Sequence, residues 1–187
     1  INMRFIVKGK LGNKLNLKKN KIGILGGSFD PAHKGHLAIS KEAKKRFKLK
    51  KIIWAITKKN PFKKKSSKSL LIRIQKCKEI IKRLSFIEVR FYEDQIKSNK
   101  TINLINYFTK NKKNEIYFLM GADNLINFHK WHKWKMISQK CNIIVFDRFG
   151  YKKKSLNSTT YKRLNEKNLK FIKFKKVNIS SSQLRKI

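Results

Sequence analysis

The sequence has few acidic residues, few cysteines and few prolines. Ten Asp and Glu stand against 49 Lys and Arg, so the formal net charge is +39 over 187 residues. Cys77 and Cys141 lie far apart, each in an apolar context, and no third or fourth cysteine completes a metal-binding pattern. We therefore expect two buried free thiols in a reducing compartment.

Long apolar runs are also missing. The longest, such as IIWAI and NIIVF, have the length of a strand and fall far short of the roughly 20 residues that a membrane helix needs. The basic N-terminus shows neither a sustained apolar stretch nor the small-residue cleavage site of a secretory signal. We expect a cytoplasmic protein without a membrane partner, folded as one globular domain, since 40% hydrophobic residues suffice for a core.

The positive charge is spread over nearly every segment, alongside many Asn and Ile. This spread is typical of a proteome-wide bias toward Lys, Asn and Ile, with the lysines on solvated faces. A surface selected to bind polyanions would carry the same charge, and both interpretations stay open. We expect no specific nucleic acid partner.

Short apolar strands alternate with amphipathic helices from residue 21 onward, whereas residues 1–20 form a basic extension. We expect strands at KIGIL, IIWAI, SFIEVRF, IYFLM and NIIVF, with FIKF as a candidate sixth. We expect helices at about 35–48, 70–84 and 101–110, and a helical stretch that carries Leu125, Phe128, Trp131 and Trp134. The alternation predicts an α/β fold, a Rossmann-like, doubly wound and mostly parallel sheet with helices on both faces.

GGSFDPAHKGH, residues 26–36, follows the first predicted strand and opens the first helix. Gly26 and Gly27 lack a Cβ and let a ligand approach the backbone, while a loop that leads into a helix offers N–H groups to an anion. His33 and His36 stand at the helix start, where imidazoles and helix dipole can face one developing negative charge. The alternative is that His33 only caps the loop and His36 is satisfied within the fold.

This stretch closely resembles G-[ST]-F-D-P-x-[HT]-x-G-H, the first signature of the nucleotidyltransferase superfamily related to class I aminoacyl-tRNA synthetases. ISSSQLR, residues 179–185, resembles the second signature, I-S-S-[ST]-x-[IL]-R. Within that superfamily, GADNLINFHKW resembles the G-x-D-x-L-x-x-F-x-x-W segment of bacterial nicotinate-nucleotide adenylyltransferases. VFDRFGYK and NPFK resemble the R-x-G-[YF] stretch and the N-P-x-K loop of the same family. We interpret residues 21–187 as a nucleotidyltransferase domain.

The resemblance implies adenylyl transfer from ATP to nicotinate mononucleotide, giving nicotinate adenine dinucleotide and pyrophosphate in NAD biosynthesis. It implies that His33 and His36 act at the α-phosphate of ATP. The other ATP contacts that it implies are Gly26, Gly27, Ser28, Phe29, Asp123, Ser180, Ser181, Ser182 and Arg185. It implies no metal ligands in the protein, because Mg²⁺ accompanies ATP and is bound chiefly by phosphates and water.

The resemblance also implies the contacts to the mononucleotide, which are Thr101, Trp131 and Arg148. Trp131 would stack on the pyridine ring, and Arg148 would face the phosphate. The family commonly has a Tyr-Thr pair in this loop, whereas SNKT has Lys100 in place of the tyrosine.

Several of these residues have a plainer interpretation. Asp123 and the three serines would also serve as N-caps, and Trp131 and Trp134 as core residues. Arg148 would also suit the surface. His129 and His132 have no carboxylate or cysteine at helical spacing that would complete a metal site.

Two other functions compete with the first. Phosphopantetheine adenylyltransferases share both signatures, and a non-catalytic, basic RNA-binding protein with a degenerate nucleotide fold would explain the charge directly. The sequence leaves open the oligomeric state, the role of residues 1–20, and the choice between the acid and the amide mononucleotide.

Overall fold

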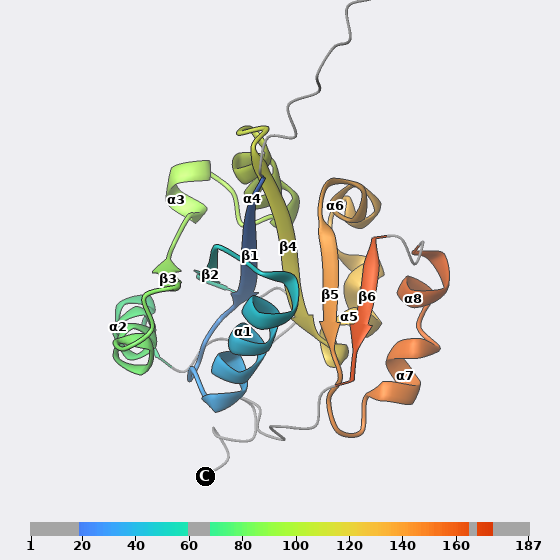
Figure 1. Ribbon diagram of the computed structural model, residues 1–187, viewed down its shortest axis with the longest axis horizontal. Helices are drawn as coiled ribbons and strands as arrows, with labels where there is room; N and C mark the ends of the chain where they lie inside the picture. Colours follow the sequence, from blue (N-terminus) through green and yellow to red (C-terminus); the bar gives the residue numbers. More distant parts are fainter. Residues whose placement is uncertain (1–18, 60–67, 165–167, 174–187) are drawn as a thin grey trace, which may run out of the picture.

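Six parallel strands form one sheet in the computed structural model, which describes residues 19–59, 68–164 and 168–173. The strands are β1 (Asn20–Gly27), β2 (Lys51–Ile56), β3 (Ile87–Arg90), β4 (Asn114–Gly121), β5 (Asn142–Phe146) and β6 (Leu169–Ile172). Their order across the sheet is β3-β2-β1-β4-β5-β6 (Figure 1). The chain winds outward from β1 to β3, returns to the other side of β1 and winds outward again to β6. The winding direction therefore reverses between β1 and β4.

Helices cover both faces of this sheet (Figure 1). They are α1 (Lys34–Phe47), α2 (Leu70–Ile81), α3 (Glu93–Ile96), α4 (Thr101–Thr109), α5 (Ala122–Asn127), α6 (Trp134–Lys140), α7 (Lys152–Leu156) and α8 (Thr159–Arg163), with a 3₁₀ turn at Phe128–Lys130. α1 and α2 pack on one face, while α4, α5 and α6 pack on the other. The predicted Rossmann-like, doubly wound α/β fold is confirmed.

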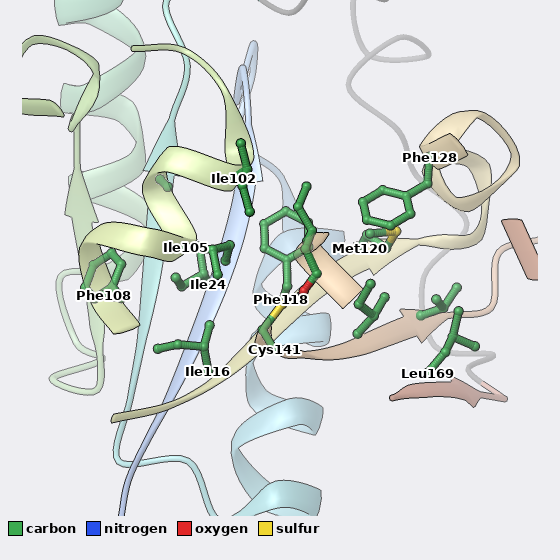
Figure 2. Packing of buried hydrophobic residues seen from close by; sticks show 14 of the residues in the cluster. Ile24, Ile102, Ile105, Phe108, Ile116, Phe118, Met120, Phe128, Cys141 and Leu169 are labelled. Atoms are coloured by element: carbon green, nitrogen blue, oxygen red, sulfur yellow. Dashed lines mark hydrogen bonds between the residues drawn. The ribbon is translucent and has the colours of Figure 1, made fainter. Parts of the chain in front are cut away.

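The core consists of two apolar layers, because successive side chains of a strand point to opposite faces. In β1, Ile22 and Ile24 pack on the α4 side, and Leu25 packs on the α1 side. Figure 2 shows the first layer, in which Ile24 and Phe118 of the strands lie beside α4 residues such as Ile105. Each such side chain, once fully buried, stabilises the fold by about 1.5–3 kcal/mol.

One predicted element is wrong in part. The apolar residues at 125, 128, 131 and 134 predict one helical stretch, but α5 ends at Asn127 and α6 begins at Trp134. A spacing of three drifts around a helix of 3.6 residues per turn, so these side chains cannot all face one side of a straight α-helix. The chain instead tightens into the 3₁₀ turn, becomes extended at Trp131 and turns at Lys133, where φ is 53°.

The structure tests the expectation for the two cysteines. Cys77 and Cys141 are buried free thiols as predicted, and burial raises the pKa of each to about 12, so both stay protonated at neutral pH.

None of the described helices is long and apolar enough to cross a membrane. NPFK at 60–63, the second signature, and residues 1–18 of the predicted extension lie outside the described residues.

Helix α1 is joined to the sheet by a buried polar contact. Trp54 in β2 is fully buried, and its indole Nε1–H donates to Ser40 Oγ of α1 at 2.9 Å. Ser40 Oγ in turn donates to the His36 carbonyl at 2.8 Å. This chain of hydrogen bonds fixes the start of α1 relative to β2.

We expect Ser40→Ala to lower the free energy of unfolding by about 1–3 kcal/mol, because it leaves the buried Trp54 N–H without its acceptor. Ser138→Ala is the matched control, since Ser138 is also buried but its hydroxyl donates to the Lys135 carbonyl of its own helix. Urea unfolding of both variants measures the difference. A Ser40→Ala protein no less stable than Ser138→Ala would contradict the role of this contact.

Candidate active site

A cavity of about 690 Å³ opens at the carboxyl ends of the strands, where the winding reverses. Its walls come from the ends of β1, β2, β4 and β5, and from the segments that follow them. Parallel α/β sheets bind ligands at this place, because the loops diverge on either side of the reversal. The volume suits a ligand of nucleotide size.

His33 and His36 form the start of α1 and line this cavity. His33 is the N-cap, and its Nδ1 accepts from the backbone N–H of Gly35 at 3.1 Å. His36 Nδ1 accepts from the backbone N–H of His33, also at 3.1 Å, so the two residues cap the helix reciprocally. An Nδ1 that accepts has no proton, so each neutral imidazole is protonated on Nε2, which is then a donor. The capping role is confirmed, and it leaves both rings suited to bind an anion.

The ring of Phe29 packs against the imidazole of His36. The Phe29 ring stacks on Trp54 at a centroid distance of 5.0 Å and lies 4.7 Å from the His36 ring. The backbone of Phe29 has φ of 48°, a left-handed conformation that costs about 1–3 kcal/mol for a residue with a side chain. Full burial of the ring offsets this by about 1.5–3 kcal/mol. The position of the His36 ring therefore depends on Phe29.

Gly26 and Gly121 both line the cavity, and a side chain at each would meet different surroundings. A Cβ on Gly26 would find Phe118 Cζ as its nearest neighbour, at 3.7 Å, so the protein interior itself leaves room for a side chain there. That side chain would stand at the cavity wall. At Gly121 the constraint is internal, because a Cβ would lie 2.5 Å from Asp123 Oδ1. Glycine at this position lets the Asp123 carboxylate fold back to the end of β4.

Asp123 and Arg148 meet across the cavity wall. Arg148 Nη1 donates to Asp123 Oδ2 at 2.6 Å, and the guanidinium also lies over the Tyr151 ring, 5.6 Å from its centroid. Asp123 is not the N-cap of α5, because Gly121 occupies that position. The Arg148 side chain is 25% exposed, so it is partly solvated as well as ion-paired. The pair places a carboxylate acceptor and a guanidinium donor side by side.

The remaining predicted residues of the described chain line the same cavity. Thr101 is the first residue of α4, with Lys100 at its N-cap. Trp131 lies in the break between the 3₁₀ turn and α6, with its ring 6.1 Å from that of Phe118. Gly27 ends β1 and Ser28 follows it, and both line the cavity. Ten predicted site residues from five segments thus converge; Ser180, Ser181, Ser182 and Arg185 lie outside the described residues.

The second histidine pair, His129 and His132, does not lie at one site. His132 lines the cavity, whereas His129 lies in the 3₁₀ turn, where its backbone N–H donates to Thr160 Oγ1 at 3.0 Å. Among residues 19–59, 68–164 and 168–173, no group of three or more His, Cys, Asp or Glu could hold a metal ion.

Comparison with known proteins identifies the family. Residues 24–187 match the family model described as cytidylyltransferase-like. A probable nicotinate-nucleotide adenylyltransferase of Pelagibacter ubique (strain HTCC1062) is 68% identical over 175 residues, which are 94% of this chain and 97% of the relative. The chain belongs to the nicotinate-nucleotide adenylyltransferase family. A probable member of this family from Clostridium botulinum (strain Eklund 17B / Type B) is 36% identical over 89% of this chain and 84% of the relative.

Solved structures of nicotinate-nucleotide adenylyltransferases share the fold. The Plasmodium falciparum nicotinic acid mononucleotide adenylyltransferase complexed with NaAD superposes with a TM-score of 0.73 at 21% identity, over 89% of this chain and 83% of that one. A putative nicotinate-nucleotide adenylyltransferase from Vibrio parahaemolyticus superposes with a TM-score of 0.62 at 19% identity, over 89% and 85% of the two chains. The arrangement of the sheet and its helices is therefore that of the family.

In this nicotinate-nucleotide adenylyltransferase family member, the structure places further residues at or near the cavity that were not predicted from the sequence. Thr57 and Glu93 line the cavity, and Arg73 is buried behind it. Arg73 lies three residues after Leu70 and four before Cys77, on the apolar face of α2. The apolar face of an amphipathic helix normally carries no charged residue. A cation on that face is therefore a sequence signal from which Arg73 could have been identified. Thr57 lies in the loop after β2 and Glu93 is the first residue of the four-residue helix α3, and neither position shows such a signal.

We expect His33→Ala to lower the free energy of unfolding by about 0.5–2 kcal/mol, because it removes the N-cap of α1. His33→Asn should stay close to the unsubstituted protein, since an Asn side chain caps a helix well. Urea unfolding of the two variants distinguishes them. Equal stability of His33→Ala and His33→Asn would contradict the capping role.

Proposed function

We propose that the chain transfers the adenylyl group of ATP to nicotinate mononucleotide. The 5′-phosphate oxygen of the mononucleotide attacks the α-phosphorus of ATP, the bond from the α-phosphorus to the β-phosphate bridging oxygen breaks, and pyrophosphate leaves. The product is nicotinate adenine dinucleotide. The observation that supports this function is the convergence of His33, His36, Asp123, Trp131 and Arg148 on one cavity of nucleotide size.

The two imidazoles supply the charge stabilisation that such a transfer needs. Negative charge on the α-phosphate oxygens grows as the bonds to the incoming and leaving oxygens change. His33 and His36 present Nε2–H donors that are oriented before the reaction, because their Nδ1 atoms are tied to the backbone. Each such donor contributes about 3 kcal/mol to the transition state.

The other residues bind and orient the two reactants. Gly26 to Phe29 present backbone to the phosphates of ATP, and Asp123 accepts from the ribose of adenosine. Trp131 stacks on the pyridine ring, Thr101 lies at the mononucleotide end, and Arg148 faces the mononucleotide phosphate. The contact between Asp123 and Arg148 supports this assignment, because it places the carboxylate for one reactant next to the guanidinium for the other. Alignment of the two reactants accounts for a large part of such catalysis.

The proposal includes Mg²⁺ and the second signature. Mg²⁺ accompanies ATP and, when bound, neutralises phosphate charge through direct and water contacts. The carboxylates on the cavity wall already have protein partners, as Asp123 does in Arg148 and Glu93 in Thr57, which suits a metal bound chiefly by phosphates. By the resemblance, Ser180 to Ser182 and Arg185 would bind the β- and γ-phosphates. The buried thiols fit a reducing compartment, so we place the reaction in the cytoplasm.

The decisive assay is pyrophosphate release from Mg·ATP by the purified protein, with nicotinate mononucleotide, nicotinamide mononucleotide and 4′-phosphopantetheine compared in parallel. We expect turnover chiefly with nicotinate mononucleotide and its loss when EDTA removes Mg²⁺. Turnover with phosphopantetheine alone would overturn the acceptor. Silence with all three, together with a tight and salt-dependent affinity for RNA, would favour the RNA-binding function instead.

We expect His36→Ala to slow turnover by about a hundredfold or more, which corresponds to the loss of one oriented donor. His36→Asn separates this effect from capping, because an amide oxygen can replace Nδ1 while the amide NH2 of the shorter side chain does not reach the position of Nε2–H. His36→Asn and His33→Asn should therefore keep their stability and lose turnover. His129→Asn is the control outside the cavity and should turn over normally. An unchanged rate in His36→Ala would contradict the role of this residue.

A further inference from the structure

Arg73 of α2 is a buried cation that binds backbone carbonyl groups. It is 2% exposed, and four of its N–H groups donate to carbonyl oxygens. Nη1 donates to Ser28 O at 2.6 Å and to Thr57 O at 2.9 Å. Nη2 donates to Lys58 O and Nε to Lys68 O, both at 3.2 Å. One side chain thus joins α2 to the segment after β1 and to the segment after β2.

The same two segments are joined on their other side. The backbone N–H of Thr57 donates to Gly27 O at 2.9 Å. Glu93, from the start of α3, accepts from the Thr57 hydroxyl and from the backbone N–H of Lys58, the latter at 3.3 Å. Arg73 therefore holds the carbonyl side of the Thr57–Lys58 peptide, and Glu93 holds its N–H side.

These contacts fix the orientation of the donors in the turn after β1. In a trans peptide the C=O and the following N–H point in opposite directions. Because Ser28 O points to Arg73, the N–H of Phe29 points away from α2. Because Gly27 O points to Thr57, the N–H of Ser28 points away from β2. Both residues line the cavity, and both N–H groups belong to the turn assigned to the phosphates of ATP.

The charge of Arg73 suits this task and a lysine would not. Burial lowers the pKa of Arg73, and the nearby carboxylates of Asp30 and Glu93 act in the opposite direction. Guanidinium stays protonated at neutral pH in any case, and its planar fork reaches several acceptors in different directions. An ammonium group is a compact point charge on a flexible stem and cannot reach all four carbonyls at once.

We infer that Arg73 is a positioning residue for ATP: together with Glu93 it holds the backbone of Gly27–Phe29 in the conformation that binds the phosphates. Arg73 is not among the residues that line the described cavity, so it acts through this turn and not on the substrate. This inference rests on the proposed function. Misplacement of a binding group by about 1 Å can cost a hundredfold in rate, so the effect is measurable.

The test is Arg73→Lys, measured by steady-state kinetics with each substrate varied in turn. We expect kcat/KM for ATP to fall by about tenfold or more, while KM for nicotinate mononucleotide stays within about threefold. Arg83→Lys, at an exposed arginine after α2, is the matched control. Leu169→Ala, in β6 at the far edge of the sheet, controls for lost stability without a change near the turn. ATP kinetics of Arg73→Lys that equal those of Leu169→Ala would overturn the inference.

Two further measurements cover the other outcomes. If Arg73→Lys does not fold, Glu93→Ala releases the same peptide from its opposite side; lowered kcat/KM for ATP supports the inference and an unchanged value overturns it. Hydrogen exchange of the Thr57 amide without substrates tests the clamp independently of activity. Faster exchange in Arg73→Lys than in Arg83→Lys supports the clamp, and equal exchange overturns it. If the unsubstituted protein is inactive with all acceptors, the proposed function fails, and exchange still decides whether the clamp exists.

Discussion

The parallel pairing of β1 with β4 is the constraint on which the site depends. Leu25 pairs with Leu119, two residues before the glycines Gly27 and Gly121 that end the two strands, so both strands stop at the same level. From there the chain leaves on opposite faces of the sheet, toward α1 and toward α5. The order of the strands creates the crevice between these two helices. The imidazoles lie on its α1 side and the Asp123 carboxylate lies on its α5 side.

Long-range electrostatic attraction and local hydrogen bonds have different roles in this crevice. A net charge of +39 creates a positive field that attracts polyanions at long range. Placement matters for the groups that the proposed function assigns to phosphate or ribose, and those in the described part of the chain are held by neighbours. Nδ1 atoms are tied to backbone, Asp123 to Arg148, and the turn after β1 to Arg73. Such prior orientation removes reorganisation from the reaction step.

The strands and the histidine loop could be predicted because their signals are local. Runs such as IIWAI are buried on both faces, and GGSFDPAHKGH combines a turn, glycines and a helix start in eleven residues. Contacts between distant segments could not be predicted. The pairing of Asp123 with Arg148 and the reach of Arg73 to Ser28 depend on which strands become neighbours. The break at Trp131 was hidden because its apolar spacing looks helical over one turn and fails over three.

The reciprocal histidine cap links the folding of α1 to the chemistry at its N-terminus. At position 36 a side chain must accept from the backbone with one edge and donate from the opposite edge, and a rigid five-membered ring with two nitrogens does both. Asparagine can do the first and lysine the second, but neither does both in one orientation. The first signature admits His or Thr at position 33 and only His at position 36, so position 36 is where a substitution separates helix capping from donor geometry.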